Sequence, residues 1–163
     1  MTGQDERYMR EALAEAGIAR EMDEVPVGAV IVYRGERIIG RGHNEKETGK
    51  NALYHAELLA IDRACRELGG WRLPESTLYV TLEPCPMCAG AIVNARIGRV
   101  VIGTADPRTG AFGGVTDLNA LPLNHKPEIV SGVLGEECAE LLRSYFREKR
   151  EKAKTEKSAS DLL

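Results

Sequence analysis

Several features that would place a protein in a membrane, in the secretory pathway or in a repeat architecture are missing from this sequence. None of its apolar runs approaches the roughly 20 residues needed to cross a membrane. The N-terminal residues contain neither the basic segment nor the apolar core of a secretion signal. No internal repeat is present. We therefore expect a cytoplasmic protein with one globular domain over residues 1–152 and a disordered polar tail over 153–163.

Cysteine is scarce, and its spacing excludes some kinds of metal site. Of the four cysteines, Cys85 and Cys88 form a single Cys-x-x-Cys pair. A zinc ribbon needs a second such pair, and a disulfide framework is disfavoured in a reducing cytoplasm. Taken alone, the pair is compatible with either a redox function or metal binding.

Positive charge is also in short supply overall, because the formal net charge is −3. Its distribution is uneven. Residues 143–157 contain seven basic and three acidic side chains, so this segment carries +4 and the rest of the chain −7. A basic end on an acidic body is compatible with phosphate binding. The alternative is a solvent-exposed helix face with ion pairs between residues four apart, and charge alone slightly favours this alternative.

The hydrophobic pattern predicts helices and strands that alternate along the chain. The expected helices cover residues 5–22, 55–68, 86–95 and 136–152, and the expected strands cover 27–33, 37–41, 77–82, 99–103 and 128–132. The first strand is apolar nearly throughout, so both of its faces should be covered. This alternation predicts an α/β fold, a three-layer α/β/α sandwich. Residues 111–127 give few periodic cues and are expected to be mostly irregular.

One constellation of residues indicates chemistry: His55-Ala56-Glu57, followed by Pro84-Cys85-Pro86-Met87-Cys88. An imidazole and two thiolates are good zinc ligands. Structural zinc sites close their tetrahedron with four protein ligands, whereas catalytic sites leave one position for water. Three ligands with the carboxylate of Glu57 beside them therefore predict a hydrolytic centre.

The spacing also predicts how the site is built. Cys85 and Cys88 are three residues apart at the start of a predicted helix, whose N-terminus favours thiolates. His55 and Glu57 are two apart and do not share a helix face, so they can converge only at the first turn of their helix. We expect two helix N-termini at one zinc ion, with Glu57 taking up and passing on the protons of the activated water.

The pattern H-x-E…P-C-x-x-C is the signature of zinc-dependent nucleoside and nucleobase deaminases. The chain resembles bacterial tRNA adenosine deaminases well beyond this motif, over residues 25–30, 42–44, 77–91, 95–97, 106–111, 123–125 and 132–138. The resemblance implies a cytidine deaminase-like fold with a five-stranded mixed sheet, a homodimer and one Zn²⁺ per subunit. It also implies hydrolytic conversion of the wobble adenosine in a tRNA anticodon to inosine, with release of ammonia.

The resemblance further assigns roles to individual residues. His55, Cys85 and Cys88 would hold zinc and Glu57 would be catalytic. The tRNA anticodon stem-loop would be bound by Asn44, Ala56, Asp106, Arg108, Tyr145 and Phe146.

Within that set, the Asn44 side chain and the Ala56 backbone would read the flipped base, and Asp106 with Arg108 would meet the loop backbone. Core packing is the alternative for Tyr145 and Phe146, and we expect it to hold for at least one of them. His43 and Glu83 are expected to be structural or to support the site from behind. The chain departs from the family's pattern at Tyr54 and over residues 112–121, near the expected mouth of the site.

Two other functions remain open on the sequence. One is a deaminase of free bases or nucleosides such as guanine or cytosine, and the other is a non-catalytic, zinc-stabilised binding module. The basic last helix and the loop at 106–111 favour a tRNA substrate, because a small substrate has no phosphate backbone to meet. Glu57 argues against the binding module, because a purely structural site has no use for an unliganded carboxylate.

Overall fold

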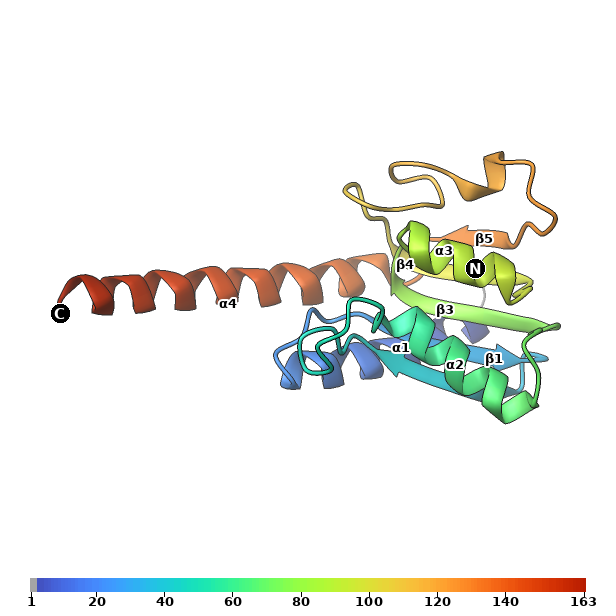
Figure 1. Ribbon diagram of the computed structural model, residues 1–163, viewed down its shortest axis with the longest axis horizontal. Helices are drawn as coiled ribbons and strands as arrows, with labels where there is room; N and C mark the ends of the chain where they lie inside the picture. The colour runs from blue at the N-terminus through green and yellow to red at the C-terminus, as the bar shows by residue number, and fades with distance from the viewer. Residues whose placement is uncertain (1–2) are drawn as a thin grey trace.

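The computed structural model describes residues 3–163, which are arranged around one five-stranded mixed sheet (Figure 1). The strands are β1 (Gly28–Tyr33), β2 (Arg37–His43), β3 (Ser76–Leu82), β4 (Arg99–Thr104) and β5 (Glu128–Ser131). Their order in the sheet is β2-β1-β3-β4-β5. β1 is antiparallel to β2 and β3, whereas β3, β4 and β5 are parallel to one another. The predicted strands and the mixed sheet are confirmed.

The helices of the described residues form a layer on each face of the sheet (Figure 1). They are α1 (Gly3–Glu21), α2 (Ala56–Leu68), α3 (Pro86–Asn94), the short 3-10 helix η1 (Leu118–Ala120) and α4 (Gly135–Asp161). In β1, Ala29 and Ile31 belong to the core beneath α2 and α3, whereas Val30 and Val32 pack with α1. This period of two explains why an apolar strand needs cover on both faces. The three-layer sandwich is confirmed.

Two glycines in β2 set how closely α2 lies on the sheet. A Cβ at Gly42 would lie 2.2 Å from the carbonyl oxygen of Ala56, and a Cβ at Gly40 would lie 2.2 Å from that of Ala60. No side chain fits at either position, so the helix backbone rests directly on the strand. Because Ala56 is the first residue of α2, this contact also fixes the first turn of that helix relative to the sheet.

The C-terminal segment differs from the prediction. The sequence analysis ended the last helix at residue 152 and expected 153–163 to be disordered, but α4 continues to Asp161. It projects from the sandwich with every side chain from Phe146 onwards exposed (Figure 1). Residues 153–161 contain no proline or glycine, and their alanines, lysines and glutamate are good helix formers. Across residues 3–163, no helix combines the length and apolar character that crossing a membrane requires.

Replacing Gly42 by alanine should destabilise the protein, because the new methyl group has no space against the α2 backbone. We expect Gly42→Ala to lower the free energy of unfolding by about 1–3 kcal/mol, the usual cost of overpacking. Gly17→Ala is the matched control. A Cβ there meets nothing within 4 Å, and alanine is the better helix former, so stability should hold or rise. Chemical denaturation measures both, and an unchanged Gly42→Ala midpoint would contradict the close contact.

Candidate metal centre and substrate cleft

Two helices begin at the same place above the sheet. His55 is the N-cap of α2 and Cys85 is the N-cap of α3, both with extended backbone and neither with a side-chain capping bond. Pro86 occupies the first turn of α3, where its missing N–H costs nothing. Cys88 follows in that turn, on the same side as Cys85. The predicted convergence of two helix N-termini is confirmed.

The three expected ligands form one compact group. The Nδ1 atom of His55 lies 3.7 Å from the sulfur of Cys85 and 3.5 Å from that of Cys88. All three ligand atoms lie within 4.8 Å of one another, and no fourth acidic, histidine or cysteine side chain of residues 3–163 joins the group. Tetrahedral zinc bonds at about 2.3 Å to sulfur and 2.0 Å to nitrogen place those atoms roughly 3.6 Å apart. The group could therefore hold a metal ion, and its donors and distances fit zinc with one open position.

Hydrogen bonds within this group prepare a thiolate. The Cys88 thiol, the His55 ring and the backbone N–H of Cys88 all donate toward the Cys85 sulfur and lower the pKa of Cys85 to about 4. The same contact with Cys85, together with burial, raises the pKa of Cys88. The hydrogen bond with Cys85 also raises the pKa of His55. Metal binding would displace the remaining protons, because thiolate and neutral imidazole are the ligand forms.

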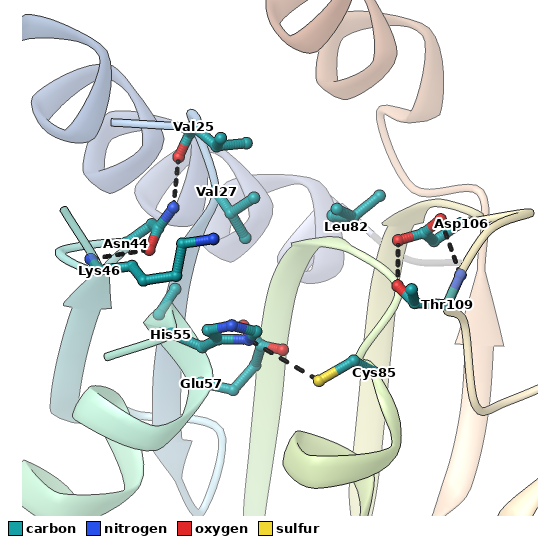
Figure 2. Close-up of a pocket in the computed structure, with 11 residues that line it drawn as sticks. Val25, Val27, Asn44, Lys46, His55, Glu57, Leu82, Cys85, Asp106 and Thr109 are labelled. Carbon is teal, nitrogen blue, oxygen red and sulfur yellow. Dashed lines mark hydrogen bonds between the residues drawn. The ribbon is translucent and has the colours of Figure 1, made fainter. Parts of the chain in front are cut away.

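Glu57 is placed to handle protons rather than to bind metal. It is the second residue of α2 and only 4% exposed. Burial raises the pKa of its carboxyl, and that effect outweighs the hydrogen bonds and the His55 charge that favour the carboxylate. Figure 2 shows Glu57 beneath His55, with its carboxyl group turned towards the Cys85 side of the site. A carboxyl whose pKa is raised in this way is suited to take up a proton and give it back during a reaction.

A small cavity of about 180 Å³ opens above this group (Figure 2). It is lined by Val25, Val27, Asn44, Lys46, His55, Ala56, Glu57, Leu82, Cys85, Asp106 and Thr109. Val25, Val27, Ala56 and Leu82 form its apolar walls, and polar groups line the rest. Its volume lies below the roughly 300–1,000 Å³ of pockets for drug-sized ligands. It suits a single small ring rather than an extended ligand.

Four of the predicted residues meet in this cavity besides the metal group. Glu57 and Ala56 line it from α2, and Asn44 lines it from the end of β2. The Asn44 oxygen accepts the backbone N–H of Lys46 at 3.2 Å, while its amide nitrogen donates to the Val25 carbonyl at 3.4 Å. The second bond is long, so the amide can reorient towards a ligand.

Asp106 lies at the rim of the cavity and stiffens its own loop. Its carboxylate accepts the backbone N–H groups of Arg108 at 2.9 Å and Thr109 at 3.3 Å, and the Thr109 hydroxyl at 2.8 Å. This is the side-chain turn geometry that aspartate favours in loops. The loop is therefore ordered before any ligand arrives.

A larger groove of about 770 Å³ adjoins the cavity and contains two more of the predicted residues. Arg108 and Phe146 line it, and it shares Val25, Leu82 and Asp106 with the cavity, so the two spaces are continuous.

The two aromatic residues of α4 separate in the structure. Phe146 is 42% exposed, whereas Tyr145 is 6% exposed and its hydroxyl donates to the Asp23 carbonyl at 3.2 Å. Tyr145 thus follows the core-packing alternative, although it also borders a third hollow beside Asn44.

Two residues lie at this site in positions that the sequence did not specify. Lys46 lies over the cavity (Figure 2), and its only sequence signal is a basic residue two positions after Asn44. Glu83 is 5% exposed, and its carboxylate accepts the backbone N–H groups of Asp106 at 3.1 Å, Phe112 at 3.0 Å and Gly114 at 2.9 Å. Glu83 therefore holds the loop that carries Asp106, which settles the role left open for it.

Known proteins resemble this chain over nearly its whole length. A family model described as MafB19-like deaminase matches residues 3–150. A tRNA-specific adenosine deaminase of Bacillus subtilis is 55% identical over 152 residues, 93% of this chain and 94% of that protein. A protein of the same name from Haemophilus influenzae is 44% identical over 155 residues, 94% of this chain and 90% of that protein.

Solved structures agree with this assignment. One, from a study of A-to-I editing by tRNA:A34 deaminases at the wobble position of transfer RNA, has a TM-score of 0.81 and 45% identity, covering 83% of this chain and 99% of that one. A guanine deaminase from Nitrosomonas europaea has a TM-score of 0.74 and 25% identity, covering 86% of this chain and 83% of that one. The chain belongs to the MafB19-like deaminase family and, within it, to the tRNA-specific adenosine deaminases.

Proposed function

We propose that this protein is a zinc-dependent tRNA adenosine deaminase that converts the wobble adenosine of an anticodon to inosine. The observation that carries the proposal is the three-ligand group with Glu57 buried beside it, at the floor of a cavity sized for one ring. The names of relatives 55% and 44% identical to this chain support the choice of substrate. The reaction consumes one water, replaces the exocyclic amine by oxygen and releases ammonia.

In this proposal His55, Cys85 and Cys88 hold the zinc ion. When bound, zinc supplies the Lewis acidity that makes a water molecule nucleophilic near neutral pH. Glu57 would take one proton from the attacking water and deliver it to the ring nitrogen beside the attacked carbon. It would then take the second proton from the added hydroxyl and deliver it to the amine, which leaves as ammonia. Backbone N–H groups at the Cys85 end of α3 would stabilise the charge that develops during attack.

The rest of the cavity selects and orients the base. Val25, Val27 and Leu82 enclose its faces, and the Asn44 amide and Ala56 backbone meet its polar edge. The adjoining groove, with Arg108 on its rim, accepts the neighbouring nucleotides of the anticodon loop. Such flipping of one base out of its stack lets a small pocket act on a large RNA.

The assembly and location follow from the same proposal. Helix α3 is apolar on nearly all sides, yet Met87 and Ala91 stay half-buried in the single chain, and Leu121 and Leu123 are exposed. An apolar surface of this kind supports a homodimer. We propose that residues 3–152 form the catalytic domain of each subunit, with one zinc ion, and that the enzyme works in the cytoplasm where its tRNA substrate is found.

Replacing Glu57 should abolish turnover without disturbing the metal. Glu57→Gln keeps the shape of the side chain but cannot carry the proton, so we expect kcat to fall by about 10²–10⁴-fold. Zinc content and unfolding midpoint should stay those of the native protein. Glu67→Gln on the exposed side of the same helix is the control and should keep full activity. Retained turnover in Glu57→Gln would remove Glu57 from the mechanism.

A substrate panel separates the three candidate functions. We expect an anticodon stem-loop to be deaminated efficiently, with kcat/KM falling steeply between roughly 50 and 200 mM salt as phosphate contacts weaken. Free adenosine, guanine and cytosine should be poor substrates.

Equal or better turnover of a free base would favour the alternative activity, for which the fold shared with a guanine deaminase is the supporting observation. If none of these substrates is turned over by zinc-loaded protein, the non-catalytic binding module is the better account.

A further inference from the structure

Five basic side chains of α4 lie in a row along one side of the helix. Arg143, Arg147, Arg150, Lys154 and Lys157 are spaced by four, three, four and three residues. With 3.6 residues per turn, they fall within a sector of about 80°, and with 1.5 Å per residue they extend over about 21 Å. We refer to these five residues as the basic stripe.

The acidic residues of this part of the helix lie elsewhere around its circumference. Glu148, Glu151 and Glu156 all fall outside the sector of the stripe by the same helical geometry. Asp161 falls within the sector, but it lies four residues beyond Lys157, so no acidic residue interrupts the stripe. The stripe is therefore a continuous line of positive charge, although the chain as a whole has a net charge of −3.

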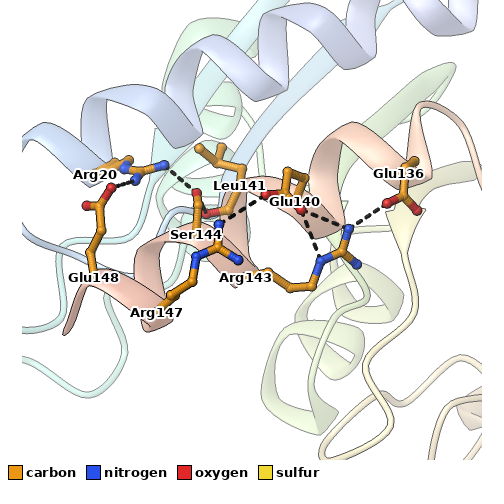
Figure 3. Close-up of polar contacts among 8 residues, drawn as sticks. All are labelled: Arg20, Glu136, Glu140, Leu141, Arg143, Ser144, Arg147 and Glu148. Carbon is orange, nitrogen blue, oxygen red and sulfur yellow. Dashed lines mark hydrogen bonds and ion pairs between the residues drawn. The ribbon is translucent and has the colours of Figure 1, made fainter. Parts of the chain in front are cut away.

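The opposite side of α4 attaches the helix to the rest of the protein. Arg20 on α1 donates to Ser144 and forms an ion pair with Glu148, both at 2.7 Å (Figure 3). Lys149 pairs with Asp23 at 3.3 Å. With these contacts made on one side, the stripe is left facing away from the attachment.

Two arginines of the stripe have partners that are easily exchanged. Arg143 contacts Glu136 and Glu140, and Arg147 contacts Glu140 at 3.3 Å (Figure 3). These carboxylates are more than half exposed, and exposed pairs contribute only about 0–1 kcal/mol, so a phosphate can replace them.

The outer three cations of the stripe are not neutralised within the chain. Among residues 3–163, Arg150, Lys154 and Lys157 take part in no ion pair. All three side chains are exposed to solvent.

The stripe begins beside the base cavity and leads away from it. Arg143, Arg147 and Arg150 line the groove that shares Leu82 and Asp106 with the cavity. Lys154 and Lys157 lie about 6 and 10 Å beyond Arg150, on the part of α4 that projects from the sandwich (Figure 1). Nucleotides next to the reacting base can occupy the groove, whereas Lys154 and Lys157 lie outside its lining.

We propose that the outer part of the stripe binds the phosphates of the double-stranded stem that closes the substrate's loop. The proposal rests on the proposed function and adds a second contact to it. A straight row of cations complements the regular backbone of an RNA duplex, which proteins recognise mainly through phosphates and shape rather than sequence. The projecting end of α4 thus distinguishes a structured stem-loop from an unpaired strand with the same target base.

The test compares two substrates and two positions on the helix. One substrate is the anticodon stem-loop, and the other is a single-stranded oligonucleotide with only the loop sequence. The variant Lys154→Gln/Lys157→Gln removes the outer stripe, and Lys152→Gln removes a cation from another side of the same exposed segment. Glutamine is a good helix former, so α4 should persist, as circular dichroism can verify.

For the double variant, we expect kcat/KM on the stem-loop to fall roughly tenfold more than kcat/KM on the loop oligonucleotide. The loss should come from a higher KM, with kcat unchanged. The slope of log KM against log salt for the stem-loop should fall by about one for each lysine removed. Lys152→Gln should match the native protein. A native salt slope and KM for the double variant, or an equal loss in Lys152→Gln, would overturn the proposal.

These outcomes are separate from failure of the proposed function. Native protein that deaminates no tRNA stem-loop at all would reject the function itself. Native protein that deaminates both RNAs with the same kcat/KM would keep the function and reject the stem contact.

Discussion

The structure depends on the meeting of two helix N-termini at one point above the sheet. His55 begins α2 and Cys85 begins α3, so an imidazole and two sulfurs come within 4.8 Å of one another. Neither helix could be displaced without separating the donors. The close contact of α2 on Gly40 and Gly42 and the direct passage from β3 into α3 are the features that hold them. The sandwich is in this sense a support for three side chains that could hold a metal ion.

Within this small region the pKa values of two acidic groups are shifted in opposite directions. Hydrogen bonds from its neighbours lower the pKa of Cys85 to about 4, which suits a metal ligand, whereas burial raises the pKa of Glu57, which suits the proposed proton carrier. Separation of acidities by environment is how one site assigns different roles to similar groups. Beyond this pair, Glu83 orders the loop of Asp106 through three backbone N–H groups. The chemistry and the rim are thus each organised by a buried carboxyl group.

Much of this could be predicted from local sequence signals. Apolar runs bounded by turn residues located every strand, and the spacing of His55, Glu57, Cys85 and Cys88 required the two helix ends that the structure contains. Lys46 could not be found in this way, because its position over the cavity depends on how the loop after β2 folds back. The prediction that α4 ends at residue 152 was wrong. A charged, polar composition predicts disorder, yet the same residues have high helix propensity. Tyr145 and Phe146 are adjacent in sequence, and only their packing separates a buried ring from an exposed one.

The most direct test of the central claim is X-ray absorption spectroscopy of purified active protein, combined with elemental analysis. The account predicts one zinc ion per chain, coordinated by two sulfurs, one imidazole nitrogen and one further light atom from solvent. A fourth protein ligand in the spectrum, or full deaminase activity in protein without bound metal, would contradict it.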